Sequence, residues 1–170
     1  MSSATNLTIA TLPRISPQSL ASLLRTPSAP SNIAIIDVRD SDFVGGHIKG
    51  CINAPTSTHD YALPELVRKL EGKEMVVFHC ALSQQRGPGS ALRYARERER
   101  VGKGVELAID GDEGKGRKEG EDGSEGKGGE GKGQKVVVLE GGFSKWQELY
   151  GEDEELTEGY QKDIWEFGGW

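Results

Sequence analysis

Apolar residues fall along the chain in short runs of two alternating kinds. Three runs are almost continuously apolar, which is typical of strands covered on both faces, and they span residues 33–38, 75–78 and 136–139. Other segments repeat leucine or aromatic residues at helical spacing, namely 15–24, 60–70, 90–100 and 143–150. Strands that alternate with helices form parallel sheets. The pattern therefore predicts an α/β domain with a central, mostly parallel sheet and helices on both faces.

A segment of different composition interrupts this alternation. Residues 110–134 hold only Gly, Asp, Glu, Lys, Arg, Ser and Gln, with no apolar side chain. Such a segment buries too little surface to offset its ordering entropy. We therefore predict one domain over residues 1–170 with a disordered surface insertion at about 102–134. A tolerated loop insertion is the simpler interpretation, and a partner-docking tail is the alternative.

Charge and composition narrow the class of protein. The chain has 170 residues and a formal net charge of −6, which argues against a nucleic-acid partner because such proteins need a basic face. No long apolar run or basic, apolar N-terminal start occurs, so we expect no membrane partner. The expected location is the cytoplasm, with the nucleus as a further location, and the oligomeric state stays open. The two cysteines, Cys51 and Cys80, are too few for a disulfide scaffold, which leaves room for cysteine chemistry.

Candidate chemistry lies in the segment FHCALSQQRGP, which connects a predicted buried strand to a predicted helix. Cys80 opens the loop and Arg86 follows six positions later. Backbone N–H groups and the helix dipole at such a connection hold an oxyanion and stabilise a thiolate, and an arginine can bind the anion with two N–H groups. We predict Cys80 as nucleophile and Arg86 as anion ligand. The oxyanion-binding loop is expected to comprise Ala81, Leu82, Ser83, Gln84, Gln85 and Arg86. A buried structural cysteine beside a surface arginine is the alternative.

Three segments together resemble a known family. HCALSQQRGP, IIDVRDSDFVGGHIKGCINAP and VVVLEGGFSKW are similar to the rhodanese-fold family that contains the M-phase inducer phosphatases and the eukaryotic arsenate reductases. The resemblance covers most of the chain outside the insertion and the extreme ends. It implies a rhodanese-like three-layer fold and in-line attack by the Cys80 thiolate on phosphorus. A phosphocysteine intermediate stabilised by Arg86 and the loop amides is then hydrolysed by water.

The same resemblance ranks the functions. Sulfurtransferases of the family place one residue fewer between cysteine and arginine, so the longer loop favours phosphate or arsenate. The leading expectation is a cysteine-dependent phosphatase of the tyrosine or dual-specificity type, acting on a phosphorylated substrate. The alternative is an arsenate reductase in which an external thiol such as glutathione or glutaredoxin completes the reduction; no other cofactor is expected. A sulfurtransferase or a non-catalytic rhodanese-like binding module comes third, since such a module would need a broken loop.

The chain departs from the M-phase inducers in two respects. The loop side chains Ala81, Leu82, Gln84 and Gln85 carry no charge, so a general acid is missing from the loop. Asp40 and Asp42 are candidate external acids, although a solvated turn is the favoured interpretation. Val38 stands where those phosphatases place a second cysteine. Cys51 is interpreted as a small core residue, and a disulfide with Cys80 is not assumed.

Four residues are candidate supports. Ser83 lies where related loops hydrogen-bond the sulfur, although a turn or capping role is equally compatible. His79 precedes the nucleophile on a strand, so its side chain is expected to point away from the pocket. Asp37 and Arg39 can orient the loop or form a surface pair, and a structural role is favoured.

No metal site is predicted, because His47 and His59 lack ligand spacing. The four aromatic residues of the C-terminal tail are expected to pack against the domain, with cover of the site as the alternative: Tyr160, Trp165, Phe167 and Trp170.

Overall fold

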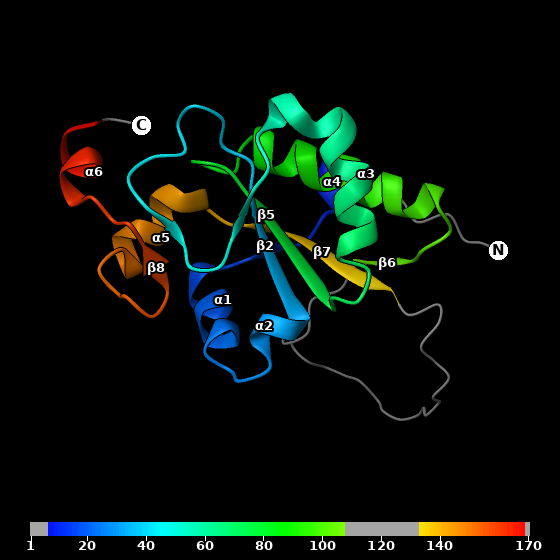
Figure 1. Ribbon diagram of the computed structural model, residues 1–170, viewed down its shortest axis with the longest axis horizontal. Helices are drawn as coiled ribbons and strands as arrows, with labels where there is room; N and C mark the ends of the chain where they lie inside the picture. The colour runs from blue at the N-terminus through cyan, green and yellow to red at the C-terminus, as the bar shows by residue number, and fades with distance from the viewer. Residues whose placement is uncertain (1–6, 108–132, 169–170) are drawn as a thin grey trace.

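The computed structural model describes residues 7–107 and 133–168, and its centre is a parallel sheet (Figure 1). The three predicted buried runs form its middle strands β2 (Ile33–Asp37), β5 (Met75–His79) and β7 (Gln134–Leu139). Three two-residue strands complete it: β4 (Ile52–Asn53) beside β2, and β1 (Arg14–Ile15) and β6 (Val105–Glu106), both paired with β7. Every pairing in this sheet is parallel, which confirms the predicted fold class.

Helices cover both faces of the sheet and make three layers (Figure 1). The helices α3 (His59–Lys69) and α4 (Arg86–Arg100) pack on one face, where Ile36, Phe78 and Val138 join their core. On the other face lie α1 (Pro17–Leu24) and α5 (Gly142–Tyr150), packed on Ile35, Val77 and Val137. Successive strand residues thus enter opposite cores, which is why these strands are apolar at almost every position.

Smaller elements and shifted boundaries depart from the predicted pattern. The Pro- and Ser-rich turn after α1 forms a single helical turn, α2 (Ala29–Asn32). Ser16 caps α1 as its type predicts, but Ile15 belongs to β1. The remaining elements are η1 (Ile9–Thr11), η2 (Thr56–Thr58), α6 (Lys162–Gly168), and β3 (His47–Ile48), which pairs antiparallel with β8 (Thr157–Glu158). Helix α4 begins at Arg86, four residues before the predicted start, so the arginine of the loop is the first residue of the helix.

The predicted limits of the insertion are wrong at both ends. Val105 pairs with Gln134, and the Gln134 N–H donates to Gly104 O at 3.1 Å, so both flanks belong to the sheet. The side chain of Gln134 is buried: it donates to the carbonyl oxygens of Leu70 and Lys73 at 2.7 and 3.0 Å and accepts from the Tyr94 hydroxyl at 2.7 Å. A polar residue thus contributes to the interior by satisfying buried groups. Residues 108–132 of the predicted insertion lie outside the described residues.

Replacing Gln134 with methionine should destabilise the domain. The change keeps the length of the side chain but removes the partner of Lys73 O and of the Tyr94 hydroxyl, whereas Leu70 O still accepts from Lys73 N–H at 2.9 Å. Each buried group left without a partner costs roughly 1–3 kcal/mol. Urea denaturation should show a clearly lower free energy of unfolding. The matched control is Gln18→Met on the exposed face of α1, which should stay within about 0.5 kcal/mol of the parent. An equally small effect at Gln134 would contradict its structural role.

Candidate active site

Cys80 lies directly after the central strand β5, at the point predicted from the sequence. Its side chain is buried, with 3% of the residue exposed. The Sγ atom accepts hydrogen bonds from the backbone N–H of Ser83 at 3.2 Å and of Gly87 at 3.3 Å. Gly87 belongs to the first turn of α4, so the sulfur also faces the positive end of that helix. The structure thus places two backbone donors and a helix N-terminus at the sulfur.

The carbonyl groups of the loop point outward, toward donors from other elements. Phe143 N–H donates to Cys80 O at 3.0 Å, Ser144 N–H donates to Ala81 O at 2.9 Å, and Arg14 Nη1 donates to Ser83 O at 3.1 Å. In a planar trans peptide the following N–H points opposite to the carbonyl. The amides that follow these carbonyls therefore point toward the inside of the loop, where an anion can accept from them.

A glycine pair allows α5 to reach the loop. Gly141 and Gly142 have φ of 79° and 62°, in the left-handed region that favours glycine. A Cβ on Gly142 would lie 2.4 Å from Ala81 O, too close for any side chain. Glycines at these positions bring the first amides of α5 against the loop carbonyls. Within the described residues, Ser83 is the one non-glycine residue with positive φ, at 57°, so the loop is itself a constrained turn.

Arg86 is held by a carboxylate that sequence reasoning placed in another role. Its Nη1 and Nη2 donate to Asp42 Oδ1 and Oδ2 at 2.9 and 2.7 Å, and Asp40 Oδ2 lies 3.5 Å from Nη1. The hydrogen bonds from Arg86 lower the pKa of Asp42. Burial acts to raise the pKa of Asp40, but hydrogen bonds from Thr56, Ser57 and Arg86 lower it overall. Both carboxyls lie against Arg86, so they do not form merely a solvated turn.

Asp37 and Arg39 form a buried pair, so the alternative of a surface pair is wrong. Arg39 Nε donates to Asp37 Oδ1 at 3.0 Å and Nη2 to Oδ2 at 2.8 Å, and both side chains are fully buried. The guanidinium also lies over the rings of Phe43 and Phe143 and donates to Gly46 O at 2.9 Å. Arg39 therefore fixes the segment 40–46, which carries Asp42, to the end of β2 and to α5.

His79 points away from the sulfur, as predicted from strand alternation. Its ring stacks near Phe143, and Nδ1 lies 3.0 Å from Cys80 O. Burial lowers the pKa of His79, although the neighbouring Asp37 carboxylate acts to raise it, so the ring is neutral at pH 7. The histidine thus packs behind the loop, between Asp37 and Phe143.

Ser83 contributes its backbone N–H to the sulfur, and its side chain is buried. No described residue provides a hydrogen-bond partner for Ser83 Oγ. A buried hydroxyl without a partner inside an anion-binding loop is available to the sulfur or to a bound oxyanion. The geometry thus keeps open the role that the resemblance implies for Ser83.

The second cysteine is remote in the fold. Cys51 packs against the core on the α1 and α5 face of the sheet, whereas Cys80 belongs to the core on the α3 and α4 face. Burial raises the pKa of Cys51 to about 12, so it is a neutral thiol at physiological pH. Cys51 is partly buried and packs against the edge of the core, and both cysteines are free.

The remaining sequence candidates have structural contacts. His47 pairs with Glu158, and His59 lies 3.0 Å from Ala54 O. Over residues 7–107 and 133–168, no cluster of three or more acidic, His or Cys side chains is arranged to bind a metal. Trp165 donates to Gly45 O at 2.9 Å and packs on Phe143, and Tyr160 donates to Gln147, so these two aromatic residues pack as predicted. The side chains of Phe167 and Trp170 lie outside the described part.

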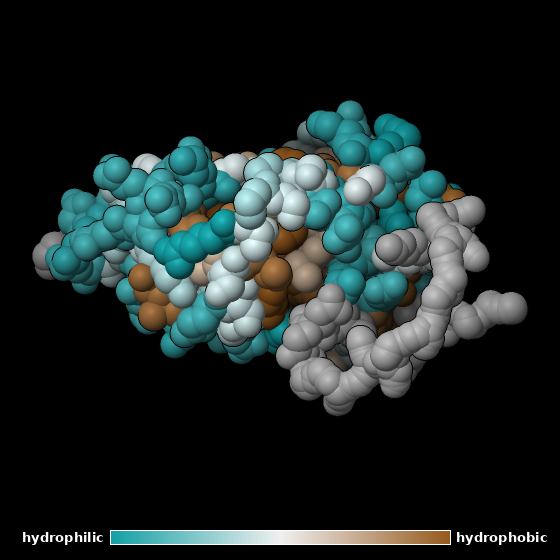
Figure 2. Space-filling model, turned by 90° about the horizontal axis from the view of Figure 1, so that it is seen from below, coloured by the Kyte–Doolittle hydropathy of each residue, from teal (hydrophilic) through white to brown (hydrophobic). Residues whose placement is uncertain are grey.

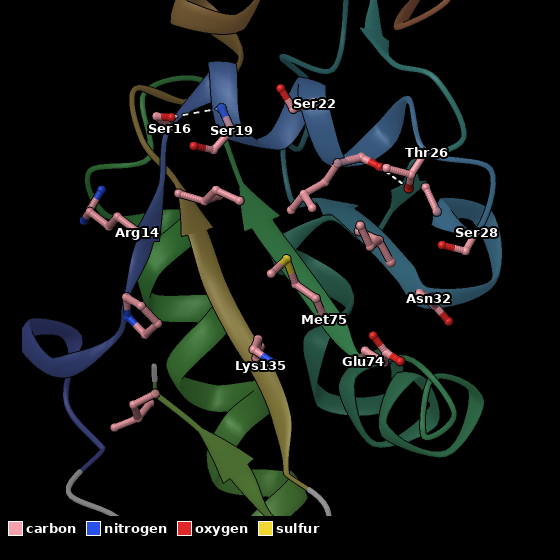
Figure 3. Close-up of a pocket in the computed structure, with 16 residues that line it drawn as sticks. Arg14, Ser16, Ser19, Ser22, Thr26, Ser28, Asn32, Glu74, Met75 and Lys135 are labelled. Atoms are coloured by element: carbon pink, nitrogen blue, oxygen red, sulfur yellow. Dashed lines mark hydrogen bonds between the residues drawn. The ribbon is translucent and has the colours of Figure 1, made fainter. Parts of the chain in front are cut away.

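A cavity of about 990 Å³ lies apart from the loop, on the face that carries α1 and α2. Figure 3 shows Ser19, Ser22 and Thr26 on one side of it and Met75 and Lys135 on the strands. Seen from this side, residues of intermediate hydropathy run across the middle of the surface beside apolar ones (Figure 2). No residue of the loop 80–86 lines the cavity, so we place the candidate site at the loop.

A three-layer domain with an all-parallel sheet and a cysteine loop between its central strand and a helix belongs to the class of cysteine-dependent α/β enzymes. The particular family follows from comparison: the family model described as "Rhodanese-like domain" matches residues 16–149, and the chain belongs to this family. None of the helices in the described ranges is long and apolar enough to cross a membrane.

Relatives of two activities share the domain. The chain is 34% identical to CDC25-like phosphatase YCH1 of Saccharomyces cerevisiae over 77% of this chain and 76% of that protein. It is 33% identical to dual specificity phosphatase ibp1 of Schizosaccharomyces pombe over 88% of this chain and 99% of that one. The solved As-Sb reductase of Leishmania major matches with a TM-score of 0.61 and 30% identity, over 84% of this chain and 81% of that one. The predicted resemblance is confirmed, and the chain is an enzyme of this family.

Proposed function

We propose that the chain is a cysteine-dependent phosphatase that acts through a phosphocysteine on Cys80. The observation that supports this most strongly is the arrangement of the loop: Sγ accepts two backbone N–H groups, and the loop carbonyls face outward. The Cys80 thiolate attacks phosphorus in line, the ester oxygen leaves, and water then cleaves the S–P bond to release phosphate. Arg86 and the loop amides stabilise the negative charge on the equatorial oxygens.

The substrate class follows from the lack of an unpaired acid near the loop among the described residues. The loop has no acidic side chain, and the nearby Asp40 and Asp42 are ionised and paired with Arg86. A leaving oxygen must therefore depart with little protonation. Aryl phosphates with electron-withdrawing substituents leave readily as phenolates, whereas alkyl alcohols do not. We infer slow hydrolysis of activated aryl phosphates and much weaker turnover of alkyl phosphates.

Arsenate reduction is the second candidate, and the position of Cys51 bears on it. Because the two cysteines lie in cores on opposite faces of the sheet, Cys51 cannot reduce an arsenic adduct on Cys80. An external thiol such as glutathione or glutaredoxin would supply that step. Cys80 and the external thiol then provide two electrons and end as a mixed disulfide, As(V) leaves as As(III), and a second thiol regenerates Cys80.

One side-by-side assay separates the two functions. The purified protein is given nitrophenyl phosphate, phosphoserine, and arsenate with glutathione and glutaredoxin. We expect hydrolysis of the aryl ester at least about tenfold faster than that of phosphoserine, since the leaving groups differ in basicity. Equal rates on the two esters would contradict the inference that no side chain protonates the leaving oxygen. Thiol-dependent arsenite formation without hydrolysis would make arsenate reductase the function.

A further inference from the structure

A carboxylate outside the loop holds the arginine that the reaction uses. We propose that Asp42 is a positioning residue: it grips the two terminal nitrogens of Arg86 and so aims the remaining Nε side of the guanidinium at the oxyanion on Cys80. The proposal rests on the proposed function, because it concerns the same anion site. It assigns to a residue 44 positions before Arg86 a role that the loop itself does not contain.

The pairing with Asp42 leaves a second pair of N–H groups on Arg86 available. A guanidinium offers one pair of N–H groups between its terminal nitrogens and another pair between Nε and one terminal nitrogen. Asp42 occupies the first pair with bonds of 2.9 and 2.7 Å. Within the described residues no acceptor binds Arg86 Nε, so the second pair stays available. The hydrogen bonds with Asp42 raise the pKa of Arg86, and the nearby Cys80 sulfur raises it further.

Asp42 is itself fixed, as a positioning group must be. Its Oδ1 accepts from the Asp40 N–H at 3.0 Å, and the segment around it is tied down by Arg39, which donates to Gly46 O at 2.9 Å and Val44 O at 3.3 Å. Arg39 is fully buried between two rings and bound to Asp37. A rigid chain of contacts thus runs from β2 through Arg39 and Asp42 to Arg86.

Asp40 provides a matched control. It carries the same charge in the same segment, but it makes a single contact of 3.5 Å with Arg86 and its main partners are Thr56 and Ser57. Removal of its charge changes the local potential without removing the paired hydrogen bonds. Comparison of Asp42→Asn with Asp40→Asn therefore distinguishes geometry from charge.

The test combines turnover with anion binding. For Asp42→Asn we expect kcat/KM on nitrophenyl phosphate to fall about 10- to 100-fold. A shift of about an ångström in a group that contacts the substrate, here the Arg86 guanidinium, has effects of this size. The Kd of inorganic phosphate, measured by calorimetry, should weaken as well. Asp42→Glu, which retains a carboxylate, should recover part of the loss, and Asp40→Asn should stay within about threefold of the parent.

A double variant makes the positioning role specific. In an Arg86→Lys background there is no fork to aim, so adding Asp42→Asn should change kcat/KM by less than about threefold. A full additional loss would overturn the proposal, as would tighter phosphate binding by Asp42→Asn, which would make Asp42 a competitor of the anion. An equal loss in Asp40→Asn would also overturn it. If the parent protein binds phosphate but turns over neither ester nor arsenate, the proposed function fails while the binding comparison still tests Asp42.

Discussion

Cys80→Ser is expected to lose at least about a thousandfold of kcat on an aryl phosphate, because removal of a covalent nucleophile leaves only the contribution of binding. The substitution is nearly isosteric, and Ser83 and Gly87 can donate to the new hydroxyl, so the free energy of unfolding should change little. Steady-state kinetics and urea denaturation of the same preparation check the two parts.

Cys51→Ser is the matched control for the nucleophile. Cys51 packs on the opposite face of the sheet and is a neutral thiol, so its removal should leave kcat within about threefold of the parent. Retained activity in Cys80→Ser would exclude Cys80 as the nucleophile. Loss of activity in both variants would indicate that the two cysteines cooperate after all.

Arg86→Lys should reduce kcat/KM by about 10²- to 10³-fold, the size seen when one preorganised donor to a developing anion is removed. An ammonium group has no planar fork, so it cannot bind Asp42 with two hydrogen bonds and present a second pair to the oxyanion. Kinetics on nitrophenyl phosphate provide the measurement. Arg93→Lys on the same helix, an exposed partner of Asp60, should be close to the parent. A near-normal rate for Arg86→Lys would show that the arginine does not contact the substrate.

The sequence predicted the middle of the fold and missed its edges for a physical reason. The strands β2, β5 and β7 bury both faces and so carry an unmistakable apolar run. The outer strands β1, β4 and β6 have two residues each, too few for any period to show. Gln134 was assigned to the insertion because composition cannot reveal that an amide satisfies three buried groups.

In the candidate site, too, features local in the sequence could be predicted, whereas contacts between distant segments could not. Cys80 and Arg86 could be predicted because one loop contains both, and its position between strand and helix is a local property of the sequence. The partner of Arg86 could not, since the contact with Asp42 depends on how two distant segments pack. Arg14, which binds Ser83 O from the edge strand β1, was missed for the same reason. The Gly141–Gly142 pair was a usable signal in the sequence, because adjacent glycines often mark left-handed backbone or a close approach of two segments. The structure shows the left-handed backbone at both positions.

The meeting of β6 and β7 has a consequence for how the domain can be engineered. Gly104 and Gln134 are joined by a hydrogen bond, and a Cβ on Gly133 would touch Glu106, so the chain departs and returns at neighbouring points. The entropy of closing a loop grows only with the logarithm of its length, by about 0.6 kcal/mol per doubling. The stability of the sheet should therefore depend only weakly on the length of the segment that connects these two strands. A folded reporter whose own termini lie close together can be grafted there, and its signal would follow the enzyme without a fused tail at either end.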